Sequence, residues 1–281
     1  MSPLLRDELR IVLSPDQLVL VRIAREFTHR GLVRRVLAKE HFPCDSVASK
    51  EAPWDGAVRA LETALAEQEK RKACATLILS NHFMRYAMVP WSAALSDEAE
   101  LMSYARHCFR QAYGSAAENW ELRLSPGPAG MPQLASAVDV RMLQALRQLF
   151  ARARLALSSV QPYLMAAYNN CRSHLQGRSA WLVLFEPGCL CLALLQHGRW
   201  ASVRSMRIGL DWREQLPQLL ERESCMATLD SVPEAVFVWA PTLENMVFPA
   251  SGRWQMHPLQ PIVKSGLMPE YEGRFAMALS R

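Results

Sequence analysis

The sequence lacks the glycine-containing motifs with which many enzymes bind phosphate or activate a nucleophile. It has no Gly-Lys pair. This excludes a P-loop, which needs backbone amides and a lysine ammonium around a phosphate. Gly-x-Gly-x-x-Gly, Gly-x-Ser-x-Gly and His-Glu-x-x-His do not occur either, and the seven histidines are dispersed. The sequence therefore predicts no common catalytic site, and we expect a protein that is not an enzyme.

Long hydrophobic runs are also missing. The longest apolar segment, 189–195, is far shorter than the roughly 18 residues that a membrane-spanning helix needs. The first eight residues include an arginine, an aspartate and a glutamate where a signal peptide would be apolar. We expect a cytoplasmic protein whose chain ends without a membrane span.

The cysteines and the basic residues argue against further classes of protein, namely metal-binding and nucleic-acid-binding proteins. The seven cysteines form no Cys-x-x-Cys pair and suit reduced thiols, with Cys189 and Cys191 on one face of a core strand. Most cations are arginines, the net charge is +5, and these arginines form no basic stripe with stacking aromatics. We expect no nucleic-acid binding and no metal site. A charge of this size is compatible with contact to anionic lipid or to an acidic partner.

The second half of the chain contains the clearest local pattern. Two apolar runs flank Glu186-Pro187-Gly188, and His197-Gly198 forms a second turn, so residues 181–209 predict a three-strand meander. A helix over 211–223 and a buried strand over 235–239 follow. Such a meander followed by a helix is typical of one half of an RNase H-like fold.

The first half repeats this order without detectable sequence repetition. Strands are predicted at 9–13, 18–23 and 31–38, and Ser14-Pro15-Asp16-Gln17 joins the first two. The remaining prediction consists of helices at 54–68, 96–113, 139–157 and 164–175 and strands at 73–79, 84–89, 120–124, 135–138 and 158–163. We infer an α/β protein made of two similar halves, 1–177 and 178–281, with a strand-helix subdomain inserted at about 73–125.

Four segments carry a resemblance to a known family. They are Ala75–Pro90 followed by Leu95–Leu101, Val138–Asn170, Gly198–Gly209, and the closing Phe275-Ala-Met-Ala-Leu-Ser-Arg281. In order and spacing they resemble the PilM family of actin-like type IV pilus assembly proteins. They also resemble the cytoplasmic domain of GspL from type II secretion and the MshI proteins of mannose-sensitive pili. The resemblance implies an actin-like fold with duplicated RNase H-like halves.

The sequence departs from this family at its nucleotide-binding turns. Active relatives have Asp-Ile-Gly-Ser-Ser and Asp-Ile-Gly-Ala there, where this chain has Leu13-Ser-Pro-Asp-Gln17 and Phe185-Glu-Pro-Gly188. Proline removes an amide donor, and glycine is needed where the backbone closely approaches phosphate. We therefore expect no cofactor. In the alternative, a nucleotide-dependent switch, Asp16, Glu186 and Gly188 would contact Mg-ATP.

The resemblance also implies a function in recognition. Its members suggest a scaffold, at the inner membrane of a Gram-negative bacterium, that binds the cytoplasmic tail of a PilN-like membrane protein and contacts a motor ATPase. The resemblance implies that the tail groove lies in the inserted subdomain. The candidates there are Tyr86, Met88, Trp91 and Tyr104, because exposed aromatics and methionine favour peptide grooves. An ordinary core role for each of them stays open, as does an enzyme on an unrelated α/β fold.

Overall fold

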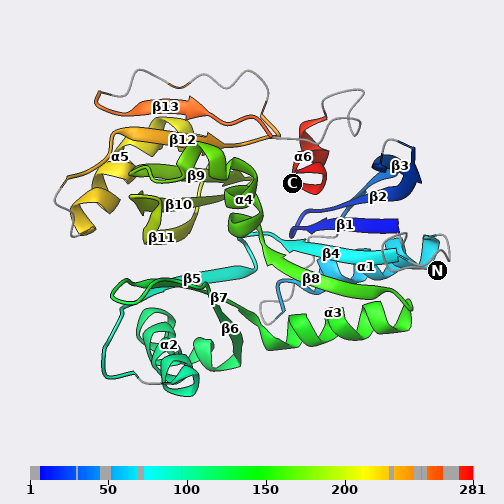
Figure 1. The fold of residues 1–281 in the computed structure, drawn as a ribbon, viewed down its shortest axis with the longest axis horizontal. Coiled ribbons are helices and arrows are strands. Elements are labelled where there is room, and N and C mark those ends of the chain that lie inside the picture. Colours follow the sequence, from blue (N-terminus) through cyan, green and yellow to red (C-terminus); the bar gives the residue numbers. More distant parts are fainter. Residues whose placement is uncertain are drawn as a thin grey trace. The chain divides into compact units, whose positions relative to one another are not determined.

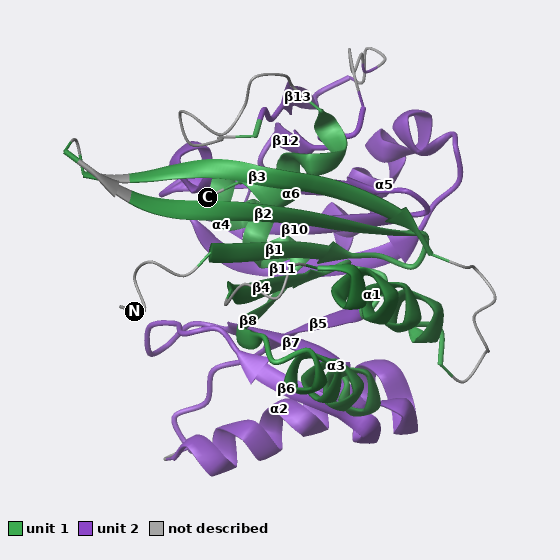
Figure 2. Cartoon of the chain, turned by 90° about the vertical axis from the view of Figure 1, so that its right-hand side faces the viewer, with its two compact units in different colours: residues 1–83, 139–170, 261–281 green, residues 84–138, 171–260 purple. Residues whose placement is uncertain are grey.

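The structure of the chain is a computed structural model. It describes residues 7–29, 31–44, 52–68, 73–95, 97–227, 231–243, 248, 252–261 and 272–280. The chain forms two compact units, each built from separate stretches of sequence (Figure 2). Unit 1 contains 1–83, 139–170 and 261–281, and unit 2 contains 84–138 and 171–260.

Unit 1 contains a five-stranded sheet with the order β3-β2-β1-β4-β8 (Figure 1). The first three strands form an antiparallel meander, while β4 and β8 continue the sheet in parallel. The β2–β3 hairpin is long and extends past the end of β1 (Figure 2). The strands are β1 (Asp7–Leu13), β2 (Gln17–Thr28), β3 (Gly31–Pro43), β4 (Ala73–Leu79) and β8 (Ala156–Pro162).

Helices cover this sheet with apolar faces. Helices α1 (Asp55–Glu67) and α3 (Val140–Arg152) contact each other, and each packs on strands of the sheet. The short α6 (Ala276–Leu279) is fully buried and packs on β1 and β2. Helix α4 (Tyr163–Leu175) runs from unit 1 into unit 2.

Unit 2 contains a second five-stranded sheet with the order β11-β10-β9-β12-β13. Its first three strands are the predicted antiparallel meander, and β12 and β13 are parallel to β9. Helix α5 (Trp212–Met226) packs its apolar side on this sheet through Trp212, Leu216 and Leu220. The strands are β9 (Ala180–Glu186), β10 (Cys189–Gln196), β11 (Arg199–Arg207), β12 (Ala235–Trp239) and β13 (Gln255–Pro258).

A three-stranded sheet of order β5-β7-β6 forms the inserted subdomain. It contains β5 (Met84–Val89), β6 (Trp120–Leu124), β7 (Gln133–Asp139), helix α2 (Glu98–Tyr113) and the 3₁₀ helix η2 (Gly114–Asn119). Its extent differs from the expected 73–125, because β4 pairs with β1 and β8 while the insertion continues through β7. It belongs to unit 2, and β5 contacts β11.

One helix boundary differs from the prediction. We expected the helix that begins after Asp139 to reach Leu157, but α3 ends at Arg152 and Leu157 lies on β8. Arg154 adopts a left-handed conformation, φ 55°, and the amide of Leu155 donates to the carbonyl of Phe150. Helices often end with a residue in the left-handed conformation, and that residue is usually glycine. Here it is an arginine, so the sequence does not indicate that the helix ends.

Unit 1 also holds a buried charge cluster. The carboxylate of Glu8 accepts from Arg10 and Arg25 at 2.6 Å each, and Arg34 lies 4.0 Å away. Burial alone would raise the pKa of Glu8, but the guanidinium charges and their hydrogen bonds outweigh it and lower the pKa to about 2. Arg10 also donates to the carbonyls of Ala278 and Ser280, and so ties α6 to β1.

The described helices include none that is both long enough and apolar enough to cross a bilayer.

Candidate functional site

Helix α2 and strand β5 position the candidate partner-binding residues. The Asp97 side chain caps α2 by accepting from the amide of Glu100 at 2.8 Å, and Gly114, φ 70°, ends the helix. Ala105 and Phe109 face the three-stranded sheet and form its core with Val89, Leu122 and Ala135. Because this face is packed, α2 presents its other side chains outward.

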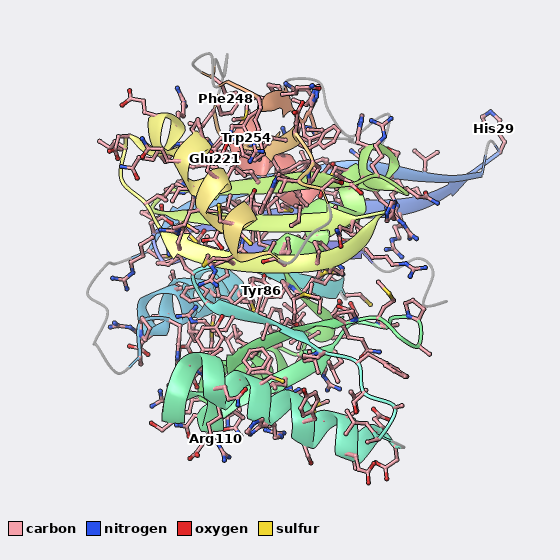
Figure 3. All side chains as sticks on the ribbon, turned by 90° about the vertical axis from the view of Figure 1, so that its left-hand side faces the viewer. His29, Tyr86, Arg110, Glu221, Phe248 and Trp254 are labelled. Carbon is pink, nitrogen blue, oxygen red and sulfur yellow. The ribbon has the colours of Figure 1, made fainter. Side chains whose placement is uncertain are left out.

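A groove of about 850 Å³ lies between the inserted subdomain and the second sheet, entirely within unit 2. We call it the wide groove. One wall is formed by β5 and by α2 from Tyr104 to Tyr113, and the other by β11 and the end of α5. Figure 3 shows Tyr86 on β5, between the strands of the second sheet and helix α2.

A second groove of about 420 Å³ lies at the beginning of α2, and we call it the narrow groove. The end of β5, the first turns of α2 and the loop between β6 and β7 line it. Pro90 and Met131 line both grooves. The two grooves are therefore neighbours within unit 2.

Exposed apolar side chains gather at these grooves. Of the five large hydrophobic residues that are exposed in the described part of the chain, Tyr113 (36%) and Met226 (54%) line the wide groove. Trp91 (48%) lines the narrow groove. Clustered exposed apolar surface of this kind marks interaction sites, whereas scattered single residues do not.

The four predicted partner-binding residues have different places in this site. Met88 and Tyr104 are partly buried and line the wide groove, while Trp91 lines the narrow groove. Tyr86 is only 3% exposed, so its side chain is part of the wall. Its carbonyl accepts from the Tyr113 hydroxyl at 2.7 Å, and burial raises the pKa of Tyr113.

Residues distant in the sequence complete the site and were missed by the sequence analysis. Glu223 on α5 is 3% exposed and lies between Arg204 and Arg222, each at 3.0 Å. Arg199 and Met226 also line the wide groove. Met226 lies beyond the helix predicted at 211–223 and at the end of α5 in the structure, so no sequence signal pointed to it.

The candidate nucleotide-binding residues lie in hairpin turns of different units. Asp16 is exposed in the β1–β2 turn of unit 1, where the Ser14 amide already donates to the Gln17 carbonyl. Glu186 and Gly188 lie at the β9–β10 turn of unit 2, and Glu186 is 6% exposed. Pro187 and Gly188, φ 74°, alone connect these two strands. The role of these three residues stays a prediction.

The described residues contain no group of three or more histidine, cysteine, aspartate or glutamate side chains placed to hold a metal ion. All seven cysteines are free thiols. Cys189 and Cys191 are buried on β10, as predicted, and burial raises the pKa of Cys191 to about 12. Such thiols stay protonated and are poor nucleophiles.

Comparison with known proteins identifies the fold. No protein-family profile matches the sequence, and no curated protein sequence matches it. Among solved structures, a chain of the PilM–PilN type IV pilus biogenesis complex matches with a TM-score of 0.58 and 14% identity, covering 82% of this chain and 80% of that chain.

Two further structures agree. The cytoplasmic domain of EpsL, an inner-membrane component of the type II secretion system of Vibrio cholerae, matches with a TM-score of 0.55 and 10% identity over 90% of both chains. A Bacteroides thetaiotaomicron protein with an actin-like ATPase fold and unknown function matches with a TM-score of 0.56 and 11% identity over 87% of both chains. The expected actin-like fold, with its duplicated sheet order, is confirmed.

Proposed function

We propose that this protein is a non-catalytic scaffold that binds a short segment of a partner protein in the grooves of unit 2. The observation that carries the proposal is the concentration of exposed apolar side chains there: Tyr113 and Met226 in the wide groove and Trp91 in the narrow one. Methionine and aromatic side chains adapt to apolar segments of a partner and dominate the binding energy of such interfaces.

The proposed partner is the cytoplasmic tail of a PilN-like inner-membrane protein. Its support is the likeness in fold to a chain of the PilM–PilN complex, together with the sequence motifs that resemble the PilM family. In this proposal the protein works in the cytoplasm at the inner membrane, within a type IV pilus or type II secretion machine. A motor ATPase would contact another face.

A nucleotide-dependent switch is the alternative function, and the actin-like ATPase fold favours it. Under it, Asp16, Glu186 and Gly188 would contact Mg-ATP. Two features support the scaffold instead: the Ser14 amide is already bonded within its turn, and Pro15 and Pro187 have no amide to donate.

Calorimetric titration of the full chain tests both functions. One titrant is the N-terminal cytoplasmic peptide of a PilN-like membrane protein, and the other is Mg-ATP. We expect the peptide to bind and Mg-ATP to give no heat at millimolar concentration. Micromolar binding of Mg-ATP without peptide binding would contradict the scaffold function and establish the alternative.

A matched pair of variants places the binding site. Met226→Glu puts a charge into the wide groove, whereas Leu210→Glu changes a fully exposed apolar residue that lines neither groove. We expect Met226→Glu to weaken peptide binding by about tenfold or more, since a desolvated charge would face apolar groups. Leu210→Glu should bind like the unmodified protein. Equal affinities in both variants would show that the peptide binds elsewhere.

A further inference from the structure

Strand β11 forms one edge of the second sheet, and the wide groove runs along this edge. Among the described strands, β11 pairs with β10 alone. Residues 199–205 all line the groove, although the side chains of a strand alternate between the two faces of its sheet. A groove that is lined by every residue of such a stretch lies against the main chain of the strand as well as against its side chains.

The turn between β9 and β10 determines which main-chain groups of β10 point toward each neighbouring strand. Cys189 pairs with Glu186 across this two-residue turn, so its amide and carbonyl point toward β9. The even-numbered residues of β10 therefore bond to β11. The carbonyl of Gly188 agrees with this alternation, because it accepts from the amide of Ile208 at 3.2 Å.

On β11 the same alternation leaves the main chain of Val203 and Ser205 facing the groove. Residues 202, 204 and 206 pair with the even-numbered residues of β10, so their amides and carbonyls are used within the sheet. Val203 and Ser205 lie between them and line the groove, and their amides and carbonyls point away from β10. The register shifts between Leu194 and Leu195, so the regular edge begins at Ser202.

The facing strand β5 is less suited to pairing with a partner. It contacts β11 but belongs to the three-stranded sheet. The carbonyl of Tyr86, on β5, already accepts from the hydroxyl of Tyr113, which also lines the groove. The main-chain groups that a bound segment can use therefore lie on β11.

We propose that the partner segment binds as an added β-strand along the groove edge of β11, with main-chain hydrogen bonds to Val203 and Ser205. This inference rests on the proposed function and adds to it the conformation of the bound segment and the atoms that hold it. An extended segment fits because its amides and carbonyls have the same two-residue spacing as those of an edge strand. A helical segment bonds its main chain internally and has no such groups to offer.

A scan of N-methylated peptides tests this mode of binding on the full chain. The probe is the N-terminal cytoplasmic peptide of a PilN-like membrane protein, methylated at one main-chain amide at a time and titrated by fluorescence anisotropy. In an added strand, every second amide faces β11 and the others face away. We expect methylation to weaken binding by about tenfold at alternate positions and to have little effect at the positions between them.

Two proline variants of the protein locate the edge. Ser205→Pro removes an amide that faces the groove, whereas Arg207→Pro removes one on the same edge that lies outside the groove. We expect Ser205→Pro to weaken peptide binding by about tenfold and Arg207→Pro to bind like the unmodified protein. Circular dichroism checks that both variants fold, and the peptide scan, which needs no variant of the protein, decides where one does not.

Three results would overturn the inference. The first is binding of the unmodified peptide with no two-residue pattern in the scan, in which case the proposed function stands without the added strand. The second is an equal loss of affinity in the two folded proline variants. The third is a dimer in sedimentation experiments that Ser205→Pro abolishes, which would assign the edge of β11 to a second copy. Failure of the unmodified peptide to bind would instead refute the proposed function.

Discussion

The two five-stranded sheets have the same strand order and the same strand directions, yet their interiors differ in chemistry. Each has an antiparallel meander followed by two parallel strands. In the first sheet Glu8 on β1 and Arg22 on β2 are buried charges, whereas β10 in the second sheet is apolar and buried from Cys189 to Leu195. The same topology is therefore compatible with a core that contains charged residues and with one that is apolar.

The buried charges of the first sheet also bond to the C-terminal segment of the chain. Arg10 connects Glu8 to the carbonyls of α6, the last helix of the chain. The second sheet instead packs on α5 through aromatic contacts, such as the stacked rings of Phe185 and Trp212, 4.7 Å apart. We therefore expect mutations of the first interior to change the free energy of unfolding in a pH-dependent way. In the second interior, we expect the free energy of unfolding to fall when a core side chain is made smaller.

The largest expected effect is the loss of a core side chain in the second sheet. Leu192 is 1% exposed and belongs to the cluster that α5 covers. Leu192→Ala should lower the free energy of unfolding by about 4 kcal/mol, because it removes apolar contacts and leaves a cavity. Urea denaturation followed by circular dichroism measures this. A loss below about 1 kcal/mol would show that the second interior repacks freely.

Glu8→Gln tests the charged interior. We expect a loss of about 3 kcal/mol at neutral pH, because two guanidinium groups lose their carboxylate. The pKa of Glu8 is lowered from 4.5 to about 2, so the unfolded state binds more protons in this range. The stabilisation is thus present above pH 4.5 and is lost as the pH falls toward 2. The difference between the two proteins should shrink over this window, and a pH-independent difference would contradict the assignment.

Two glycines in corresponding turns, one in each meander, allow the two meanders to be compared directly. Gly198 in the β10–β11 turn has φ +75°, and an added Cβ would lie 2.5 Å from the backbone nitrogen of Gly177. Gly31 in the β2–β3 turn has φ +101° and open space around it. Gly198→Ala should cost about 3 kcal/mol and Gly31→Ala about 1 kcal/mol, since only the first adds a backbone clash to the conformational strain. Equal costs from thermal denaturation would refute the close approach at Gly198.

The smallest effect is expected at the surface of the β2–β3 hairpin. Arg35 and Glu26 form an ion pair of 3.3 Å, but both side chains are more than half exposed. Arg35→Ala should change the free energy of unfolding by less than about 0.5 kcal/mol, because solvent screens such pairs. A change as large as that of Glu8→Gln would show that solvent exposure does not determine how much an ion pair contributes to the free energy of unfolding in this protein.

The sequence predicted the meanders because their turns contain proline, glycine and aspartate in positions that such turns require. It also predicted the end of α2, where Gly114 supplies the left-handed conformation. The end of α3 could not be predicted, because Arg154 has a positive φ there in place of the glycine that would signal a helix end. The assignment of 73–79 to the insertion had a similar cause, since β4 and β5 both show strand patterns and only pairing separates them.

A small part of the candidate site could be predicted from the sequence. Met88, Trp91 and Tyr104 lie on the predicted strand, loop and helix of the insertion and do line the grooves. Tyr86 illustrates the limit, because neighbouring positions on one strand differ in burial and the sequence does not say which face is covered. Arg199 and Met226 come from β11 and α5, which are distant in sequence from the insertion, and only the tertiary fold brings them to the site.

Hydrogen exchange of the full chain, measured by mass spectrometry with the PilN-like peptide and separately with Mg-ATP, tests the central claim most directly. The account predicts that the peptide slows exchange in β5, α2 and β11, and that Mg-ATP leaves the turns at 13–17 and 186–189 unchanged. Protection of both turns by Mg-ATP, with no protection of the grooves by the peptide, would contradict the scaffold and make this protein a nucleotide-dependent switch.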